Sequence, residues 1–446
     1  MSKVGPYMAY YNRPVPEADD FLTRVGPGTP CGEYMRRYWH PFLLASEIKD
    51  TPLAVRLLGE DLVVFRDLSG RLGLLHRNCI HRGTSLEFAI PAERGIRCCY
   101  HGWHYDVDGT ILDTPAEPAS SRIKQNFCQG AYPVREAHGL VFAYMGPPEL
   151  MPEFPIYDTF AFPTDNQIVP FKMNLPCNWL QIVENASDPM HNAFLHAIVS
   201  GEQFSAAFKV LPALDFVETP LGFLSMATRK VGDFVFIRAS DIILPNVGQF
   251  PNGGNQVDRE MLGVRPYLTR WSTPLDDTHA LYVGYAHLNS YNDPARNFRP
   301  EDFGVDRIPF IGQTGDRPYR ERQREPGDYD AVVSQGAIAN RKNEHLGTTD
   351  RGVVMFRRLL AKAINDTREN KTPELPRLYA SGEVRTYAHE TVLRLPRGES
   401  LSDPSALEDF GRRAAQVFVE TDHLLPAERE REAEVRIRQL LEGAIA

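Results

Sequence analysis

The chain has 446 residues, which is enough for two or three domains that each bury a core of their own. Its content of 42% hydrophobic and 24% charged residues is that of an ordinary globular enzyme. The net charge of −9 argues against a nucleic-acid partner, because the phosphate backbone binds basic surfaces. The N-terminal stretch lacks the apolar core of a signal peptide, and no apolar run approaches the roughly 20 residues that span a bilayer. We therefore expect no membrane span.

The cysteine content points to a reducing compartment. Six cysteines are sparse for a chain of this length, and Cys31, Cys128 and Cys177 lie far apart in the sequence. A disulfide framework would place more cysteines in a shorter chain. We expect reduced thiols and a cytoplasmic protein.

Residues 1–41 are predicted to form an N-terminal arm with one helix. Pro30 stands at the expected start of this helix, and Tyr34, Tyr38 and Trp39 give it an aromatic face.

Residues 42–150 are predicted to form a small all-β domain. Hydrophobic residues dominate the short stretches 61–65, 72–75 and 139–144, and turn residues separate them. The dipeptide Asp108-Gly109 is typical of a hairpin turn.

Two short motifs of Cys and His lie within this β domain. Cys79 and His81 form the first, and Cys98 and His101 form the second. One thiolate and one imidazole from each loop suit a two-iron cluster in which sulfur holds one iron and nitrogen the other, as in a Rieske [2Fe–2S] centre. A structural zinc site also uses Cys and His, but zinc fingers usually pair like with like. The mixed motifs favour the Rieske centre, and the Cys-x-x-His spacing selects Cys98 rather than Cys99.

From residue 151 to residue 446 the pattern changes to longer strands and helices, and we expect a second domain over this range. The polar stretch 289–330, dotted with Pro and Gly, is more typical of a lid or insertion than of a linker. An antiparallel sheet covered by helices is the predicted architecture, so the fold class is α+β. Helices are expected near 178–200, 350–368, 404–423 and 427–443, and strands near 208–217, 222–230, 233–244, 264–271 and 279–288.

The expected helix near 178–200 carries a further pair of histidines, His191 and His196. Positions five apart in a straight α-helix lie about 140° apart around the axis, so the two side chains would not face one ion. Pro189 should break the helix, and the break would let the two imidazoles converge. Two histidines alone are a weak sign of a metal site, and the cluster motif in the same chain strengthens it.

These segments together resemble the Rieske non-haem iron aromatic ring-hydroxylating oxygenases, and more closely the alpha subunits of the phthalate dioxygenase-like branch. The similarity covers about residues 40–370. It implies that His191 and His196 hold a mononuclear Fe(II) and that Asn185 lies near this iron. The stretches that carry the resemblance are NCIHRGTSLEFAI, RCCYHGWHYDVDGTI and the DPMHNAFLH segment at 188–196.

The resemblance also implies a carboxylate as third iron ligand, because two imidazoles and one carboxylate leave positions open for O2 and substrate. Asp328 and Asp330 are the candidates. In the branch, the ligand Asp is followed by an Arg and then by Glu-His-Leu-Gly, which correspond here to Arg341 and residues 344–347. On that match we expect Asp330 to be the ligand.

The resemblance implies a terminal oxygenase that uses O2 to hydroxylate a small aromatic substrate. The sequence has no dinucleotide fingerprint or flavin motif, so electrons should come from a separate NAD(P)H-dependent reductase, which in this branch carries a flavin and a plant-type [2Fe–2S] centre. Cis-dihydroxylation and O-demethylation both stay open, because substrate placement decides between them. Two alternatives are a Rieske-type electron-transfer protein without oxygenase activity and a zinc-stabilised binding protein.

Arg238 is a candidate substrate residue. It lies on an expected strand whose alternation places Phe234 and Phe236 on the same face. A buried Arg among aromatic rings requires an anion, either a structural carboxylate or the carboxylate of a substrate. In the phthalate dioxygenase-like enzymes an Arg on a comparable strand binds the substrate carboxylate, which implies a carboxylated aromatic here.

Asp188 precedes His191 by three residues and so shares a helix face with it. A metal-bound His usually donates its free ring N–H to a carboxylate or carbonyl. In the family this aspartate joins the iron site to a Rieske histidine of the neighbouring subunit. The resemblance therefore implies that His101 of one chain approaches Asp188 of the next, in a homotrimer or a hexamer made of two trimers.

Overall fold

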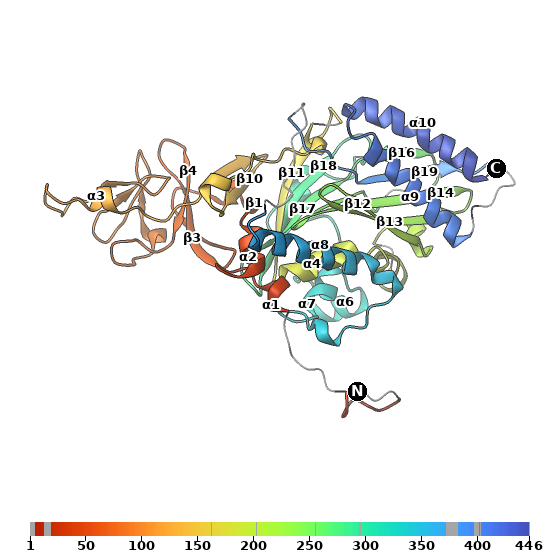
Figure 1. Ribbon diagram of the computed structural model, residues 1–446, viewed down its shortest axis with the longest axis horizontal. Coiled ribbons are helices and arrows are strands. Elements are labelled where there is room, and N and C mark those ends of the chain that lie inside the picture. Colours follow the sequence, from red (N-terminus) through yellow and green to blue (C-terminus); the bar gives the residue numbers. More distant parts are fainter. Residues whose placement is uncertain are drawn as a thin grey trace.

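The structure, a computed structural model, describes residues 5–12, 19–161, 163–201, 203–254, 256–293, 296–371, 382–396, 401 and 403–445. Figure 1 shows a smaller lobe around strands β3 (Glu60–Arg66) and β4 (Leu72–His76) and a larger lobe that contains helices α4 (Trp179–Ser187) and α8 (Arg351–Arg368). Short strands build the smaller lobe, and an antiparallel sheet with helices builds the larger one. The predicted α+β class is confirmed.

Three small antiparallel sheets build the smaller lobe, with strand orders β1-β10-β9, β2-β3-β4 and β5-β6-β7-β8. The strands predicted at 61–65, 72–75 and 139–144 correspond to β3, β4 and β10. The bounds of the remaining elements are β1 (Trp39–Leu44), β2 (Leu53–Leu57), β5 (Ile90–Pro91), β6 (Ile96–Arg97), β7 (His104–Tyr105), β8 (Ile111–Asp113), α3 (Ile123–Asn126), β9 (Val134–Ala137) and β10 (Leu140–Tyr144).

The N-terminal arm differs from its prediction, because its described part contains two short helices, α1 (Asp20–Thr23) and α2 (Pro30–Met35). Thr29 caps α2 by accepting a hydrogen bond from the amide of Gly32, and Pro30 occupies the first helical position. Strand β1 follows directly and begins at Trp39, so the arm passes into the smaller lobe without a linker.

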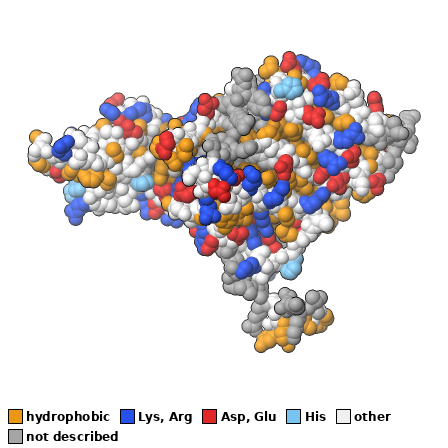
Figure 2. Space-filling view, viewed as in Figure 1, with side chains coloured by type: hydrophobic (Ala, Val, Ile, Leu, Met, Phe, Trp, Pro, Cys, Tyr) orange, Lys and Arg blue, Asp and Glu red, His pale blue; other side chains and the backbone are white. Residues whose placement is uncertain are grey.

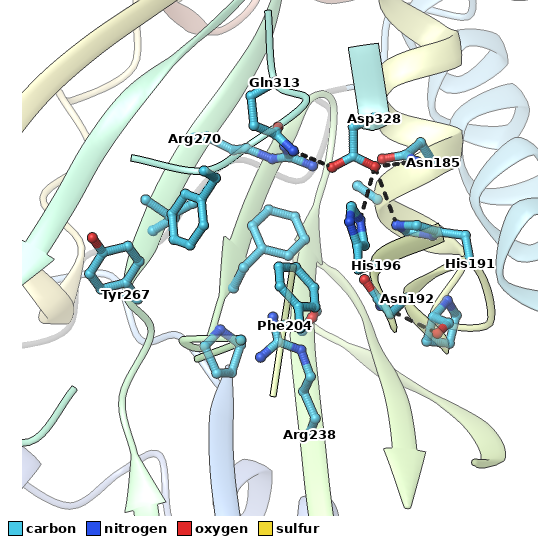
Figure 3. Close-up of a pocket in the computed structure, with 18 of the residues that line it drawn as sticks. Asn185, His191, Asn192, His196, Phe204, Arg238, Tyr267, Arg270, Gln313 and Asp328 are labelled. Carbon is cyan, nitrogen blue, oxygen red and sulfur yellow. Dashed lines mark hydrogen bonds and ion pairs between the residues drawn. The ribbon is translucent and has the colours of Figure 1, made fainter. Parts of the chain in front are cut away.

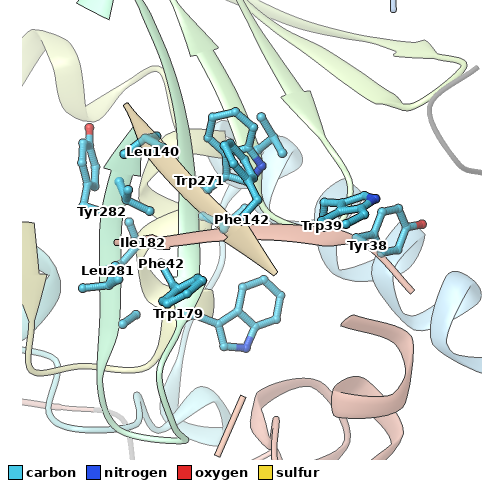
Figure 4. Close-up of a cluster of buried hydrophobic side chains, with 14 of the residues drawn as sticks. Tyr38, Trp39, Phe42, Leu140, Phe142, Trp179, Ile182, Trp271, Leu281 and Tyr282 are labelled. Atoms are coloured by element: carbon cyan, nitrogen blue, oxygen red, sulfur yellow. The ribbon is translucent and has the colours of Figure 1, made fainter. Parts of the chain in front are cut away.

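Strand β1 lies at the junction between the two lobes. Figure 4 shows Trp39 and Phe42 from β1 and Phe142 from β10 packed with Trp271 and Leu281 of the large sheet. Each of these side chains is at most 8% exposed. Burying a large apolar side chain stabilises by about 1.5–3 kcal/mol, so this cluster holds the smaller lobe in one orientation against the larger.

A nine-stranded antiparallel sheet forms the centre of the larger lobe, with the order β11-β18-β17-β15-β14-β13-β12 and with β19 pairing both β14 and β16. The bounds of its strands are β11 (Gln167–Leu175), β12 (Ala213–Thr219), β13 (Gly222–Val231), β14 (Phe234–Ile243), β15 (Val247–Phe250), β16 (Met261–Val264), β17 (Leu268–Pro274), β18 (Ala280–Leu288) and β19 (His389–Arg394).

Strand β11 was missed by the sequence analysis because Pro170 interrupts its hydrophobic pattern. A proline cannot donate a backbone hydrogen bond and is tolerated mainly at the edge of a sheet. In the structure β11 is an edge strand of the large sheet, paired with β18 along one side and joined to residue Val305 by a single bridge at Lys172, which explains how it accommodates the proline.

The two faces of the large sheet carry different helices. On strands β13 and β14, Leu224, Met226 and Ile237 point into a core that includes helices α9 (Pro404–Glu420) and α10 (Pro426–Ile445), seen at the upper right of Figure 1. Ser225 points the other way and donates a hydrogen bond to a carbonyl of α4. Strand alternation therefore separates a structural face from the face that carries the site described below.

The segment 289–330 bends over this second face. It contains helix α6 (Tyr319–Arg324) and leads into α7 (Asp328–Val333). Its side chains Ile308, Phe310 and Gln313 reach the cavity beside α4. The segment that was expected to be a lid or insertion therefore forms part of the cavity wall.

Acidic and basic side chains are interspersed on the face seen in Figure 2, without a continuous basic stripe. Among the described residues, no helix combines the length and the apolar composition that crossing a bilayer would require.

Candidate functional site

Two loops of the smaller lobe bring the expected Cys and His side chains together. Each Cys begins a tight turn, because the amide of Gly83 donates to the carbonyl of Cys79 (2.8 Å) and the amide of Gly102 donates to the carbonyl of Cys98 (3.1 Å). The two glycines have φ angles of 76° and 72°, a left-handed conformation that side chains disfavour. The glycine after each motif is thus required by the turn that presents the ligands.

The four side chains divide into a buried and an exposed pair. Cys79 and Cys98 are 4% and 3% exposed, whereas His81 and His101 are partly exposed. The two imidazole rings lie with their centroids 4.6 Å apart, and His81 also stacks on Trp103 at 4.5 Å. This division suits a cluster whose sulfur-held iron lies inside and whose nitrogen-held iron lies near the surface.

The environment of the thiols also fits a cluster. Burial raises the pKa of the Cys79 thiol, the Tyr105 hydroxyl 2.9 Å from its sulfur partly opposes the rise, and the nearby Cys98 adds to it. Two buried thiols held side by side become thiolates readily only when a cation is bound between them. Cys99, by contrast, is exposed.

The second pair of histidines lies on the larger lobe, beyond the end of α4. Pro189 separates α4 from a further helix that begins at His191, so both histidines lie on the same side of the break. The prediction that the proline makes them converge is therefore wrong in its mechanism. The turn His191–Ala193 continues as a π-helix over Phe194–Val199, and π-helical hydrogen bonds bring residues five apart onto one face. The ring centroids of His191 and His196 lie 5.4 Å apart.

Asp328, at the start of α7, completes a group of three with these histidines (Figure 3). Its Oδ1 lies 3.6 Å from His191 Nε2 and 3.2 Å from His196 Nε2, and the three candidate ligand atoms lie within 4.8 Å of one another. Two imidazoles and one carboxylate form the donor set of non-haem iron sites with open positions.

The geometry does not place Asp330, the expected ligand, in this group. Its carboxylate accepts hydrogen bonds from Arg322 (2.6 Å) and from the amide of Gly327 (3.1 Å). Residues two apart on a helix lie about 200° apart around the axis, so only one of Asp328 and Asp330 can face the histidines. Asp330 instead caps the first turn of α7 and anchors the preceding loop.

Hydrogen bonds to the remote ring nitrogens orient both histidines. Nδ1 of His191 donates to the carbonyl of Asp188, and Nδ1 of His196 donates to Oε1 of Gln203 at 2.9 Å. Each Nε2 is thereby left free to face Asp328, which is the tautomer that a metal ligand needs. The Asp188 carboxylate itself lies 3.8 Å from His191 Nδ1, so the carbonyl of Asp188 makes the closer contact.

Charge and burial act in opposite directions within the group. Burial alone would raise the pKa of Asp328, but His196 and His191 hold it well below its usual range. Burial lowers the pKa of His191, whereas at His196 the effect of burial is outweighed by the Asp328 carboxylate, which raises the pKa. Asn185 donates to Asp328 Oδ1 (3.2 Å) and further stabilises the buried carboxylate.

A cavity of about 80 Å³ adjoins the group and lies between α4, the sheet and the segment 289–330 (Figure 3). Aromatic rings contribute to its walls, and two arginines, Arg238 and Arg270, project from the sheet into it. The ring-bearing residues of the wall besides the histidines are Phe204, Phe250, Tyr267, Tyr282 and Phe310.

The two arginines of the cavity differ in their partners. Arg238 pairs with the buried carboxylate of Glu390 at 3.3 Å. Arg270 lies between the rings of Tyr282 (3.8 Å) and Phe250 (4.2 Å) and has no carboxylate partner among the described residues. The sequence analysis missed Arg270, because the surrounding stretch LTRWST carries no local motif.

A second, open cavity of about 650 Å³ lies beside Asp188 and is also lined by His191 and Asn185. Its wall includes Glu344, which belongs to the Glu-His-Leu-Gly motif, and Arg357, which binds Glu344 and Glu184 at 2.7 and 2.6 Å. The His191 side chain therefore borders both cavities.

Comparison with known proteins identifies both parts of the chain. Residues 38–132 match the model of the Rieske [2Fe-2S] domain, and residues 143–208 match a family described as LigXa C-terminal domain like. The oxygenase subunit of tert-butanol monooxygenase / tert-amyl alcohol desaturase from Aquincola tertiaricarbonis is 45% identical over 89% of this chain and 87% of its own length. The oxygenase subunit of phthalate 4,5-dioxygenase from Pseudomonas putida is 33% identical over 78% of this chain and 86% of its own.

A solved structure shows the same fold. NdmA of Pseudomonas putida CBB5 with caffeine superposes with a TM-score of 0.57 at 20% identity, covering 76% of this chain and 94% of the other. This likeness extends across both lobes and supports the α+β architecture.

We predict that Tyr105→Phe lowers the reduction potential of the cluster. The hydroxyl lies 2.9 Å from Cys79 Sγ, and a hydrogen bond to a cluster sulfur stabilises the added negative charge of the reduced state. The shift should be on the order of tens of millivolts, since 59 mV corresponds to a tenfold change for one electron. A redox titration followed by visible absorption measures it, and an equal potential in the variant and the wild type would contradict the role assigned to Tyr105.

Proposed function

Because the chain belongs to the Rieske non-haem iron oxygenases, in the branch that includes phthalate dioxygenase, we propose that it is a terminal oxygenase that receives electrons from a separate reductase and oxidises a small aromatic carboxylate with O2. The observation that carries this proposal is the group of His191, His196 and Asp328 at one end of a cavity lined by aromatic rings and two arginines. A simple electron carrier would need neither the group nor the cavity.

Cys79, His81, Cys98 and His101 would hold the [2Fe–2S] cluster, and His191, His196 and Asp328 would hold the mononuclear iron. When bound there, the cluster would supply one electron and the iron would supply an open site for O2. We assign the third ligand to Asp328 rather than Asp330, because only the Asp328 carboxylate faces both imidazoles.

The chain's own residues bind and orient the substrate. Tyr267, Tyr282 and Phe310 would contact an aromatic ring, and Ile308 narrows the same wall. The position of a ring between these walls would decide which carbon lies closest to the iron, and so decide between dihydroxylation and O-demethylation.

Arg270 supports a carboxylated substrate. Burial lowers the pKa of its guanidinium to about 9, which reflects the cost of keeping a charge in this place. The residues opposite it on the neighbouring strands are Gly248 and Gly284, so no other side chain occupies these positions. A planar guanidinium between two rings, open to a cavity, suits the two oxygens of a carboxylate. Arg238 is less suited, because Glu390 already offsets its charge.

The 45% identical relative favours a second candidate substrate. Its name records the oxidation of tert-butanol and tert-amyl alcohol, which are small, branched and neutral. A cavity of about 80 Å³ fits small molecules best. The charge of Arg270, which Asp328 offsets only in part, counts against a neutral alcohol, since a buried charge without a close anion is costly.

The electron partner is proposed on separate grounds. The two relatives compared above are named as oxygenase subunits, which indicates systems with further components. We propose a reductase with a flavin and a plant-type [2Fe–2S] centre for this chain.

We further propose that electrons pass between copies of the chain in a homotrimer. In Figure 1 the smaller lobe extends away from the helices α4 and α7 that carry the second site. The open cavity beside Asp188 leaves its carboxylate accessible from outside, where the partner subunit's His101 would meet it. Two such trimers could stack as a hexamer by the same symmetry.

The assignment of the third ligand predicts a difference between two neighbouring variants. Asp328→Ala should lower the iron content from about three to about two atoms per chain and abolish turnover, because the cluster keeps its iron and the mononuclear site loses it. Asp330→Ala should keep about three iron atoms, with a lower thermal stability of the loop that Arg322 holds. Metal analysis and visible spectra measure both. Loss of one iron in the Asp330 variant alone would restore Asp330 as the ligand.

The substrate assignment predicts the effect of Arg270→Gln. The KM for benzoate or a substituted benzoate should rise about 10- to 100-fold, because a hydrogen bond to a charged group contributes about 1.5–3 kcal/mol. Steady-state assays with a surrogate reductase measure it, and tert-butanol serves as the neutral control substrate. If the wild type prefers tert-butanol and the variant keeps that activity, the second candidate is the correct one.

The route between subunits predicts that Asp188→Asn retains both metals and a reducible cluster but loses most product formation. The amide keeps the size of the carboxylate and removes the charge that would bind the partner subunit's His101. Single-turnover oxidation of the pre-reduced cluster measures the transfer directly. A normal rate in this variant, or a monomeric wild type that is fully active, would contradict the route.

A further inference from the structure

The two oxygens of the Asp328 carboxylate have different surroundings. Oδ1 faces the Nε2 atoms of His191 and His196 at 3.6 and 3.2 Å and accepts a hydrogen bond from Asn185. Oδ2 points away from the histidines and accepts a hydrogen bond of 2.7 Å from Nε2 of Gln313 (Figure 3). The shorter bond is therefore made to the oxygen that does not face the candidate metal position.

A carboxylate can bind a metal ion through one oxygen or through both. Turning the Asp328 carboxylate so that both oxygens approach one ion would move Oδ2 away from the Gln313 amide and break this hydrogen bond. Binding through both oxygens would also occupy a coordination position that two imidazoles and one oxygen leave open. The Gln313 amide thus opposes the loss of an open position.

The backbone around Gln313 is fixed to the start of α7. Gly312 and Gly327 pack so closely that a Cβ added to Gly327 would lie 2.3 Å from the Cα of Gly312. The amide of Tyr329 donates to the carbonyl of Gly312 at 3.0 Å. Gln313 therefore keeps its place relative to Asp328 even though it comes from the wall segment, which also lines the substrate cavity through Phe310.

We propose that Gln313 is a positioning residue that holds Asp328 to coordination through Oδ1 alone and so keeps a position on the iron open for O2. The inference rests on the proposed iron site and deepens it, because it assigns a role to a residue outside the three ligands. Gln313 acts through Asp328.

The experiment compares iron binding with the binding of a probe for the open position. Full-length protein with its cluster is loaded with Fe(II), and nitric oxide serves as the probe, followed by electron paramagnetic resonance. Gln313→Met has nearly the same size and lacks the N–H donor. We expect nitric oxide to bind about tenfold more weakly to this variant, while Fe(II) is held at least as tightly as in the wild type, because the freed Oδ2 becomes a second ligand atom.

Two further variants make the result specific. Gln313→Glu keeps the polarity of the side chain, lacks the N–H donor and repels Oδ2, so it should shift nitric oxide binding in the same direction. Thr314→Val alters the neighbouring side chain, which bonds Asp316 rather than Asp328, and should leave both affinities unchanged.

A merely structural role predicts a different pattern. If Gln313 only stabilises the loop, its loss weakens Fe(II) binding and lowers the melting temperature, while the iron that remains binds nitric oxide normally. That result, or equal effects of Thr314→Val and Gln313→Met, would overturn the inference. A wild type that binds no third iron would instead refute the proposed function itself, so the two failures are distinguishable.

Discussion

The carboxylate of Asp328, which is 18% exposed and lies against two imidazoles, is the constraint on which the rest of the site depends. A buried carboxylate costs several kcal/mol unless cations and hydrogen-bond donors surround it. His196 and His191 favour the charged form of Asp328, and Asn185 and Gln313 donate hydrogen bonds to its two oxygens. Three features place these side chains near one another. They are the break at the end of α4, the π-helix that carries His196, and the close contact between Gly312 and Gly327. The same negative charge makes the group attractive to a divalent cation.

Charged side chains of both signs line the cavity beside this group. Asp328 carries the carboxylate, Arg238 and Arg270 project from the strands, and the charge of Asp328 raises the pKa of Arg270 against the effect of burial. Arg229 and Arg238 share one face of β13 and β14, and Arg270 projects from β17. Glu390 offsets one of these charges, and burial lowers the pKa of Arg229 and of Arg270 to about 9. The carboxylated substrate proposed above would place its charged group beside Arg270, within reach of the strands that line the cavity.

Local motifs predicted the cluster loops and the histidine pair. The residues of the site that no motif revealed are brought there by long-range packing. The cluster loops were found because Cys, His and the glycine that closes each turn lie within five residues of one another. The motif favoured Asp330 whereas the geometry favours Asp328, because motif spacing locates a loop but not the phase of the helix that follows it. Arg270 and Gln313 stand in stretches without any motif, and only the pairing of β17 with its neighbours and the folding of 289–330 onto α7 bring them to the site. The π-helix could not be foreseen from propensity, since it depends on how the histidines pack.

The Arg and Glu of the motif that follows α7 act on the position of α4 rather than on the substrate cavity. Arg341 binds Glu184 through both carboxylate oxygens, at 3.0 and 2.8 Å, and Arg357 joins Glu184 to Glu344. Glu184 lies one turn before Asp188 on the same helix, so this network determines where the end of α4 lies. Because Asp188 borders the outer cavity and its carbonyl orients His191, a shift of α4 would move the outer surface and the histidine together. The network therefore joins the face that would receive electrons to the group that would hold the iron. This link explains why the motif accompanies the histidine pair, although neither Arg341 nor Glu344 lines the substrate cavity.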